Sequence, residues 1–437
     1  MAQVGRISGP LLKSNLERNG IDLAFKDVSS STPTLFLDVN NNRIGVVKNS
    51  PIAELDLGTI GVSEYQQQGK FTDRYSIYGD TVDISGDYAV SGNRYFDVGA
   101  VNNQGIAYVY KKSGNTWTEI QQLTASDGIA NDGFGYSVAI DGDTIVVTAR
   151  GVDVGAQSNA GAVYVFTRDG DTWTQQGSRF TTDTPIGGRN FGISCDISGD
   201  TIVVGADGIS SGLSTNIGKE GAAYVFTRTG DTWTQQQKLE SPTPSNKEYF
   251  GQQVAISGDT VIAGAYLRDV GTKTGAGAAF VFTRSSGTWS QQQELTASDA
   301  DFNDRFAESV DIDGDYIVCG AQNANPPSPG SIGAIYIFYR SGNTWTQQQR
   351  ISAFDATGTN IGERVGIGGN TIVVGARAND LGGGSYSGTA YVFTRSGTTW
   401  TLKSKHAPAV SAPFDDFGAA AATVSYTHLT LPTTPYV

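Results

Sequence analysis

Residues 134–176 read FGYSVAIDGDTIVVTARGVDVGAQSNAGAVYVFTRDGDTWTQQ, and this stretch decides the fold. Apolar runs rich in Val, Ile, Tyr and Phe alternate with Gly, Asp and Asn, which favour turns. The pattern predicts four short strands, at 137–140, 144–147, 162–166 and 173–176. The second and third runs are apolar almost throughout, which predicts a sheet covered on both faces. The Asp141–Gly142 pair predicts a type I′ hairpin turn between the first two strands.

The same stretch recurs along the chain. All six tryptophans follow a Gly-x-Thr-type turn, at spacings of 56, 60, 56, 56 and 55 residues: Trp117, Trp173, Trp233, Trp289, Trp345 and Trp400. A repeat of this length with four antiparallel strands is typical of a β-propeller blade, which buries its faces against its neighbours. The tryptophans are therefore interpreted as structural residues that pack between blades. The Gln residues that follow them are interpreted as solvent-facing side chains of the outermost strand.

The predicted fold is an all-β propeller of four-stranded antiparallel blades, of seven-bladed design, with six complete blades and a truncated seventh. Residues 64–71 resemble an orphan fourth strand, and residues 415–425 resemble the start of a seventh repeat. Pairing these two ends would remove exposed sheet edges. We therefore expect three regions: an N-terminal docking or oligomerisation segment, the propeller, and a tail interpreted as non-native, at 1–63, 64–424 and 425–437.

The combination of Phe-Gly, a tight turn, Gly-Ala and a YVFTR–TW run resembles the FG-GAP repeat family over roughly residues 64–424. The resemblance implies the seven-bladed propeller found at the head of integrin alpha subunits, with roles in cell-surface adhesion and ligand binding, often with calcium. This sequence departs from the calcium-binding members, which carry an Asp-rich loop between the first two strands. It has only a DGD or SGD hairpin there, which cannot place six to eight oxygens around Ca²⁺.

The N-terminal region differs from the repeats. Its segments RISGPLLKSNLERNGIDLAF and LFLDVNNNRIGV resemble a module of tail fibres and virion structural proteins of marine phages. A short helix is expected at 10–19 and a hairpin around 40–42. Because so short a region cannot bury much core alone, it is interpreted as docking to virion or tail proteins, or as forming a homotrimer. A poorly ordered leader is the alternative.

Composition excludes several functions. The net charge of −13 opposes binding to nucleic acid, whose phosphates attract cations. No apolar run is long enough to cross a membrane, and the N-terminus has no secretory signal pattern. With two histidines, there is little material for histidine chemistry. Cys195 and Cys319 lie inside apolar strands of different repeats and are interpreted as buried free thiols.

The sequence predicts a protein that is not an enzyme. Residues 208–212 read GISSG, which matches the spelling of a nucleophile elbow but lies in a loop without a histidine partner. Paired carboxylates are abundant in the loops, so a glycan depolymerase is kept as a lesser alternative.

Function is expected on one face of the propeller. Antiparallel strands place the loops between strands 2 and 3, and those between consecutive blades, on the same side, and such variable loops commonly carry recognition. The candidate ligand-binding residues are Arg150, Asp153, Tyr266, Arg268, Asp269, Arg377 and Asp380. Weak candidates for a cation such as calcium are Asp127, Asp132, Asp299, Asp301 and Asp304, with turn capping as the favoured alternative. No metal or other cofactor is assigned.

These observations predict a virion structural or tail-fibre protein, located in the phage particle, whose loop face binds a glycan or protein of the host surface. The alternative is a bacterial cell-surface adhesin of the same repeat family, located outside the cell. Neighbouring genes for tail or capsid proteins favour the first, and a neighbouring secretion system favours the second.

Overall fold

The structure is a computed structural model. It describes residues 23–26, 33–38, 43–46, 55–57, 81–114, 116–208, 221–243, 248–324, 333–352, 361–376, 388–406 and 420–423. The chain divides into two compact units, Met1–Gln68 and Gly69–Val437. All regular elements in the described ranges are strands. Consequently, no helix in those ranges is long and apolar enough to cross a membrane.

The N-terminal unit contains one antiparallel sheet of four strands in chain order. These are β1 (Leu23–Lys26), β2 (Pro33–Asp38), β3 (Arg43–Val46) and β4 (Leu55–Leu57). The pairing of Asp38 with Arg43 closes β2 and β3 into a hairpin, which confirms the hairpin predicted around residues 40–42. The helix predicted at 10–19 lies outside the described residues.

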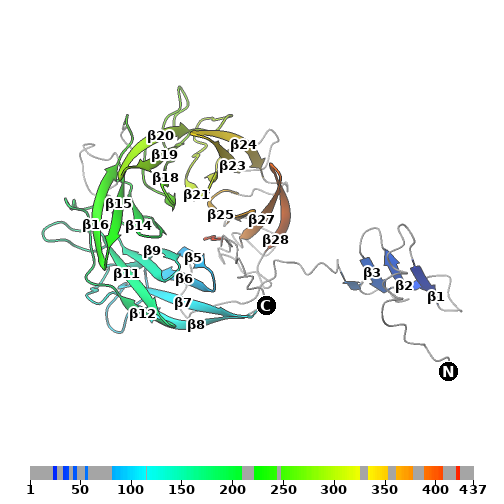
Figure 1. The fold of residues 1–437 in the computed structure, drawn as a ribbon, viewed down its shortest axis with the longest axis horizontal. Coiled ribbons are helices and arrows are strands. Elements are labelled where there is room, and N and C mark those ends of the chain that lie inside the picture. Colours follow the sequence, from blue (N-terminus) through cyan, green and yellow to red (C-terminus); the bar gives the residue numbers. More distant parts are fainter. Residues whose placement is uncertain are drawn as a thin grey trace, which may run out of the picture. The chain divides into compact units, whose positions relative to one another are not determined.

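In the second unit, the described residues form six four-stranded antiparallel sheets, the blades, arranged around a common centre (Figure 1). Blades 1 to 3 are β5 (Thr81–Ser85), β6 (Tyr88–Asn93), β7 (Ile106–Ser113), β8 (Thr116–Leu123); β9 (Phe134–Asp141), β10 (Thr144–Ala149), β11 (Ala162–Asp169), β12 (Thr172–Gln175); and β13 (Cys195–Ser198), β14 (Thr201–Ala206), β15 (Ala222–Thr229), β16 (Thr232–Leu239). Blades 4 to 6 are β17 (Val254–Ser257), β18 (Thr260–Ala265), β19 (Ala278–Ser285), β20 (Thr288–Leu295); β21 (Ser309–Asp313), β22 (Tyr316–Ala321), β23 (Ala334–Ser341), β24 (Thr344–Ser352); and β25 (Arg364–Gly368), β26 (Thr371–Ala376), β27 (Thr389–Ser396), β28 (Thr399–His406). The first strand of each blade lines the central channel.

The expectation of a seven-bladed design with a truncated seventh blade is wrong, because the described residues of this unit form six blades. Of the residues expected to open a seventh repeat, Ala420–Thr423 are described, and they form no strand. They lie in the channel instead, where Ala421 and Ala422 pack against Gly366 of β25. A short alanine-rich segment therefore fills space beside the sixth blade. Residues 64–71, expected as an orphan strand, lie outside the described residues.

The predicted strands of blade 2 are confirmed, but the turn between the first two differs from the prediction. Asp141 pairs with Thr144, so the two turn residues are Gly142 and Asp143. Gly142 has a φ of 54°, whereas Asp143 is not in the positive-φ region. A positive φ at the first central residue alone is the type II′ pattern, so the type I′ prediction is wrong. The cause is register: the glycine stands first in the turn, and Asp141 is the last strand residue.

The hydrophobic core lies between blades. One apolar cluster occupies each junction between consecutive blades, and it draws side chains from both of them. Five of the six tryptophans belong to these junction clusters, whereas Trp117 packs against a smaller cluster within blade 1. Trp173 is 2 % exposed, and its ring meets that of Tyr88 in blade 1 edge-to-face, with centroids 5.9 Å apart. Cys195 and Cys319 are buried free thiols within the same layers, as predicted.

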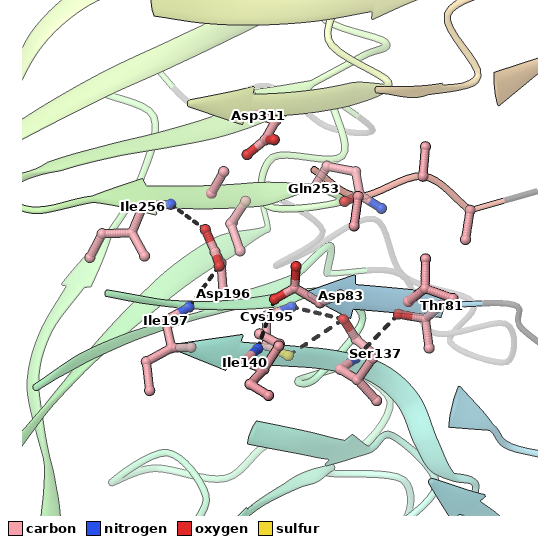
Figure 2. A pocket seen from close by; sticks show the side chains of 18 of the residues that line it. Thr81, Asp83, Ser137, Ile140, Cys195, Asp196, Ile197, Gln253, Ile256 and Asp311 are labelled. Carbon is pink, nitrogen blue, oxygen red and sulfur yellow. Dashed lines mark hydrogen bonds between the residues drawn. The ribbon is translucent and has the colours of Figure 1, made fainter. Parts of the chain in front are cut away.

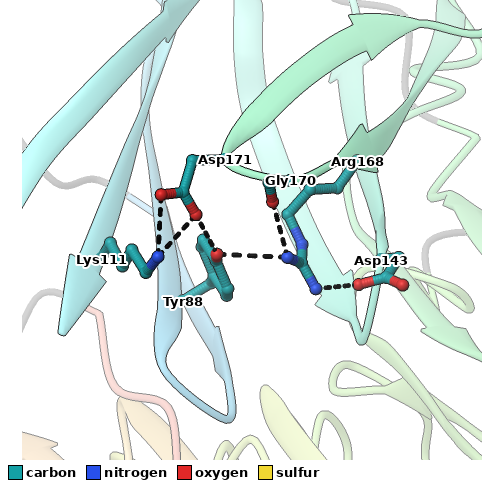
Figure 3. A network of polar contacts seen from close by, with 6 residues as sticks. All are labelled: Tyr88, Lys111, Asp143, Arg168, Gly170 and Asp171. Carbon is teal, nitrogen blue, oxygen red and sulfur yellow. Dashed lines mark hydrogen bonds and ion pairs between the residues drawn. The ribbon is translucent and has the colours of Figure 1, made fainter. Parts of the chain in front are cut away.

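A polar network joins the outer parts of blades 1 and 2 (Figure 3). Asp171, in the last turn of blade 2, accepts hydrogen bonds from Lys111 at 2.6 Å and from Tyr88 at 2.6 Å. The hydrogen bond from Lys111 is the main reason that the pKa of Asp171 is lowered. Arg168 donates to the Tyr88 hydroxyl at 3.1 Å and pairs with Asp143 of its own blade. The second Asp of the DGD turn therefore holds an arginine that reaches the preceding blade.

The same arginine clamp recurs in the next three blades. Arg284, for example, pairs with Asp259 of its own blade and donates to Thr201 of the preceding blade at 2.9 Å. Its guanidinium also lies 5.1 Å from the Trp289 ring, a favourable cation–π contact. The equivalent sets are Arg228 with Asp200 and Thr144, and Arg340 with Asp315 and Thr260. The Arg, Asp and Trp of the repeat thus act together to hold adjacent blades in contact.

The glutamines after the tryptophans also join blades, which corrects their interpretation as solvent-facing side chains. The Gln293 amide donates to the Trp345 carbonyl and accepts from the Trp345 amide, both at 2.8 Å. Gln292 accepts a hydrogen bond from the Trp345 indole at 2.9 Å. The backbone pairing recurs at Gln121–Trp173, Gln237–Trp289 and Gln349–Trp400. A side-chain amide thereby continues the backbone pairing from one blade to the next.

Replacing Gln293 with alanine is expected to lower the free energy of unfolding by about 1–3 kcal/mol, because the amide and carbonyl of Trp345 lose their partner while half-buried. Chemical denaturation of the two proteins measures the difference. Gln291 is the matched control, since it is exposed on the same strand, and its alanine variant is expected to stay within about 0.5 kcal/mol of the parent. Equal effects at the two positions contradict the role assigned to Gln293.

Candidate ligand-binding face

The loops between strands 2 and 3 and the loops between blades lie on one face, which we call the loop face. Backbone hydrogen bonds tie the two kinds of loop together: the amide of Gly133 donates to the Asn103 carbonyl, and the amide of Arg305 donates to the Gly275 carbonyl. The short turns occupy the other end, where Arg168 donates its amide to the Asp143 carbonyl. The loop face is therefore a set of braced segments on a rigid scaffold.

Three of the loops between strands 2 and 3 share one construction, in blades 1, 2 and 4. An Asp near the start of each loop accepts the backbone N–H of the residue six positions later: Asp97 from Asn103, Asp153 from Asn159 and Asp269 from Gly275. The distances are 2.7–2.9 Å. Asp153 and Asp269, predicted to bind ligand, thus have an internal role in shaping their loops. The sequence signal was present, because each of these Asp residues is followed by Val-Gly.

Arg268, another predicted ligand-binding residue, is an anchor at the base of the loop in blade 4. Its guanidinium pairs with Glu248 at 2.7 Å and with Glu294 at 2.8 Å. The Arg268 side chain is 12 % exposed and that of Glu248 is fully buried. These carboxylates hold the cation inside the loop base and leave little of it for a ligand. The predicted Tyr266 lies nearby against Tyr249, with ring centroids 4.8 Å apart, and burial raises its pKa.

The acidic residues between blades pair with the protein itself. Asp127 accepts from Arg179 at 2.6 Å and from the Tyr164 hydroxyl at 3.0 Å. Asp299 repeats this arrangement with Arg350 and Tyr336, at 2.8 and 2.9 Å. Asp301 pairs with Lys273 at 2.7 Å, and the hydrogen bond from Lys273 is the main reason that the pKa of Asp301 is lowered. Three of the five weak cation candidates are therefore already neutralised by nearby cations.

The other two, Asp132 and Asp304, are buried turn caps. Asp132 accepts the backbone N–H of Ile129 at 2.8 Å, and Asp304 accepts that of Asp301 at 2.6 Å. Burial raises the pKa of both carboxyls. Within the described ranges, no group of three His, Cys, Asp or Glu residues is arranged to hold a metal ion.

A cavity of about 300 Å³ opens on the loop face over blades 1 to 3, and Arg150 lines it. The guanidinium of Arg150 lies 4.6 Å from the centre of the Tyr136 ring, and that of Arg94 lies 4.6 Å from the same ring. Arg94 also lies 4.7 Å from the ring of Tyr95, which is 48 % exposed. The remaining side chains that line the cavity are amides and one buried carboxyl: Asn103, Asn131, Asn159, Asn190 and Asp132.

Sequence reasoning found Arg150 but missed Arg94, Tyr95 and Tyr136. Arg94 and Arg150 follow the second strands of adjacent blades, while Tyr136 directly follows a Phe-Gly pair. The signal lay in the variation at that last position, where the other described repeats carry Ile193, Gln252, Glu308 and Glu363. The remaining predicted residues, Arg377 and Asp380, lie outside the described residues.

A second cavity, of about 420 Å³, is the central channel (Figure 2). Asp83, Asp196 and Asp311 reach into it from the first strands of blades 1, 3 and 5, while the even-numbered blades carry Ala139, Ala255 and Gly366 at this position. Each Asp accepts two backbone N–H groups, one from the next residue and one from the following blade. For Asp196 these are Ile197 at 2.8 Å and Ile256 at 2.7 Å.

The alternation has a simple physical reason. The innermost strand is a sheet edge, and its inward N–H groups need acceptors. One carboxylate with two oxygens serves two blades, so an Asp in every second blade is sufficient. Asp83 serves Ile84 and Ile140, and Asp311 serves Ile312 and Ile367, in the same way. These carboxyls are therefore structural, and burial raises the pKa of Asp83 and of Asp311 to about 7.

The described residues offer no arranged nucleophile. Burial raises the pKa of both cysteine thiols, which keeps them protonated. His406 ends β28 on the outermost strand and contacts Ser404 at 2.8 Å. Of the GISSG motif at 208–212, only Gly208 is described. The described residues of the loop face therefore offer guanidinium, amide and aromatic groups, which can bind a ligand.

The FG-GAP repeat family model matches residues 117–166, 173–226, 233–282, 289–338 and 345–393. Each match begins at a tryptophan on the outermost strand and ends on the third strand of the next blade, so it spans the junction described above. A comparison with curated proteins finds no significant match. An FG-GAP propeller suggests a ligand-binding or adhesion-type protein. Because the matches cover more than half of the sequence, the chain belongs to the FG-GAP repeat family.

Proposed function

We propose that this protein is a non-enzymatic virion structural or tail-fibre protein whose loop face binds a glycan or protein on the host surface. The observation that carries the binding role is the cavity over blades 1 to 3, with Arg94, Tyr136 and Arg150 grouped at its wall. Guanidinium and tyrosine side chains combine charge, hydrogen bonding and a flat apolar surface, and both residue types are enriched at recognition hot spots.

Residues that join the blades differ from residues that line the cavity, and this difference supports the proposal. The repeated Arg, Asp, Gln and Trp residues join the blades, as at Arg284, Asp259 and Trp289. Tyr136, at the cavity wall, occupies a position that varies from repeat to repeat. A rigid scaffold with non-repeated side chains on one face is the usual arrangement for recognition. The sequence of the N-terminal unit resembles a module of phage tail fibres. This resemblance supports a role in docking the propeller to other virion proteins, and a location in the phage particle.

Substitution of an exposed tyrosine on the loop face tests the binding role. The labelled protein is applied to a panel of bacterial cells and isolated surface polysaccharides, and we expect saturable binding to some of them. Tyr95→Ser is expected to weaken that binding at least tenfold, because Tyr95 lines the cavity and is 48 % exposed. Tyr339→Ser is the matched control, since Tyr339 is 39 % exposed on β23 and outside the cavity.

Two results oppose the proposal. If the protein binds none of the cells and polysaccharides, or if both tyrosine variants bind as the parent does, recognition by the loop face is wrong. Release of oligosaccharides from a bound polysaccharide, followed by chromatography, contradicts the non-enzymatic role. Immunogold labelling of phage particles tests the location, and labelling confined to bacterial cell surfaces favours an adhesin.

A further inference from the structure

The cavity over blades 1 to 3 gathers positive charge in a protein of net charge −13. Arg94 and Arg150 come from different blades, yet each guanidinium lies 4.6 Å from the centre of the Tyr136 ring. The ring holds both cations near one wall of the cavity. An anion that enters the cavity is therefore attracted by the Arg150 guanidinium, with that of Arg94 against the same ring.

Arg150 differs from most arginines of the propeller. Within the described ranges it has no carboxylate partner, and its guanidinium lies over the Tyr136 ring. Other arginines pair with carboxylates: Arg168, Arg179, Arg228, Arg268, Arg284, Arg305, Arg340 and Arg350. Arg150 is half-buried, so its guanidinium has lost part of its water without gaining an ion pair. It is suited to receive a negative charge from a ligand.

The acid in the cavity wall does not cancel this charge. Asp132 is 2 % exposed, and its carboxylate accepts the N–H of Ile129. Burial also raises the pKa of Asp132, which opposes its ionisation. The net effect of the charged groups in the wall is therefore positive.

The remaining groups match a sugar. The asparagines of the wall present amide donors and acceptors suited to hydroxyl groups. Loop geometry fixes all four in the left-handed region, with φ between 50° and 68°: Asn103, Asn131, Asn159 and Asn190. Asn103 and Asn131 come from different loops and are joined by a side-chain hydrogen bond of 3.1 Å. Tyr95 offers an exposed ring on which a pyranose can pack. Preformed polar groups of this kind set the orientation of a ligand.

We propose that this cavity binds an anionic saccharide, a sugar unit whose carboxylate or sulfate group is held by Arg150 and Arg94 while its hydroxyl groups meet the asparagine amides. The inference rests on the proposed function and names the ligand class of the same face. Specificity follows from the charge on Arg150: a neutral sugar leaves the Arg150 guanidinium without a counter-charge, whereas a free anion lacks the hydroxyl and ring contacts.

The test measures binding to four immobilised polysaccharides: polygalacturonate, its carboxyl-reduced form, a sulfated galactan and its desulfated form. We expect binding to one or both anionic polymers and at least tenfold weaker binding to the matched neutral forms. Binding to polygalacturonate alone identifies a carboxylate ligand, and binding to the sulfated galactan alone identifies a sulfate ligand. In either case, Arg150→Gln is expected to reduce affinity at least tenfold, with partial recovery in Arg150→Lys.

A control separates the cavity from general charge. Lys403 is exposed on β28, outside the cavity, and Lys403→Gln removes the same charge. It is expected to leave binding unchanged, and thermal unfolding checks that all variants fold. Equal losses in the Arg150 and Lys403 variants, or equal binding to neutral and anionic polymers, overturn the inference. A different result separates this inference from the proposed function. If Tyr95→Ser weakens binding to host cells but Arg150→Gln does not, the proposed function stands and the anionic ligand is wrong.

Discussion

Replacing Arg268 with methionine is expected to lower the free energy of unfolding of the propeller by about 3–5 kcal/mol. The variant removes the guanidinium that pairs with Glu248 at 2.7 Å, although the side chain of Glu248 is fully buried. Removing one partner of a buried pair costs more than the pair itself contributes, because the remaining charge stays desolvated. Chemical denaturation followed by tryptophan fluorescence measures the change.

Two further variants define the cause. The double variant Arg268→Met with Glu248→Leu is expected to recover most of the loss, since neither charge remains buried. Lys273→Met, in the same loop, breaks the exposed pair with Asp301 and is expected to change stability far less than Arg268→Met does. If Arg268→Met weakens ligand binding without changing stability, Arg268 is a binding residue as the sequence predicted, and the anchoring role is wrong.

The sequence was sufficient to predict the repeat, the strands and the face that carries the irregular loops. These features depend on local signals: the tryptophan spacing, the apolar runs, and turn residues such as Gly142. The number of blades was not predictable in the same way. A seventh repeat was inferred from the Phe-Gly pair before the alanine run, but Ala420–Thr423 form no strand. A blade needs four strands, and a motif for its first strand does not establish the other three.

The candidate site was predicted only in part, because its members depend on contacts between repeats. Arg150 was found from its place in a variable loop, but Arg94 joins it at the Tyr136 ring only when blades 1 and 2 pack together. Conversely, Asp153 and Arg268 also come from variable loops, but their side chains contact the protein itself. Asp153 caps its own loop, and Arg268 anchors the base of its loop. A charged residue in a loop is therefore ambiguous until the partners that neutralise it are known.

The stability of the propeller is expected to fall as the pH rises from about 4 to about 8, because of the carboxyls in the central channel. Burial raises the pKa of Asp83 and of Asp311 from 3.8 to about 7, and that of Asp196 is raised as well. The neighbouring channel carboxylates contribute to the increase at Asp196 and Asp311. A group that binds its proton more tightly in the folded chain stabilises the fold wherever that proton is bound.

The direction follows from comparing the two states. Below pH 4 both the folded and the unfolded chain carry protonated carboxyls, and the full contribution is present. Between pH 4 and 7 the unfolded chain releases these protons first, so the free energy of unfolding declines, and the decline ends above the folded pKa of about 7. A tenfold change in an ionisation constant is about 1.4 kcal/mol, so the increases in pKa at Asp83 and at Asp311 each correspond to on the order of 4 kcal/mol.

Denaturation at pH 5 and pH 8 measures this effect, and Asp311→Asn identifies its source. The asparagine cannot ionise and keeps one acceptor for the two N–H groups of Ile312 and Ile367, so the variant is expected to be less stable at pH 5 but to lose less stability on going to pH 8. Asp87→Asn is the control, because Asp87 is exposed in a turn outside the channel, and its pH dependence is expected to match the parent. A parent protein that gains stability between pH 5 and 8 indicates that the N–H bonds to the carboxylates outweigh the cost of burying three charges around one channel.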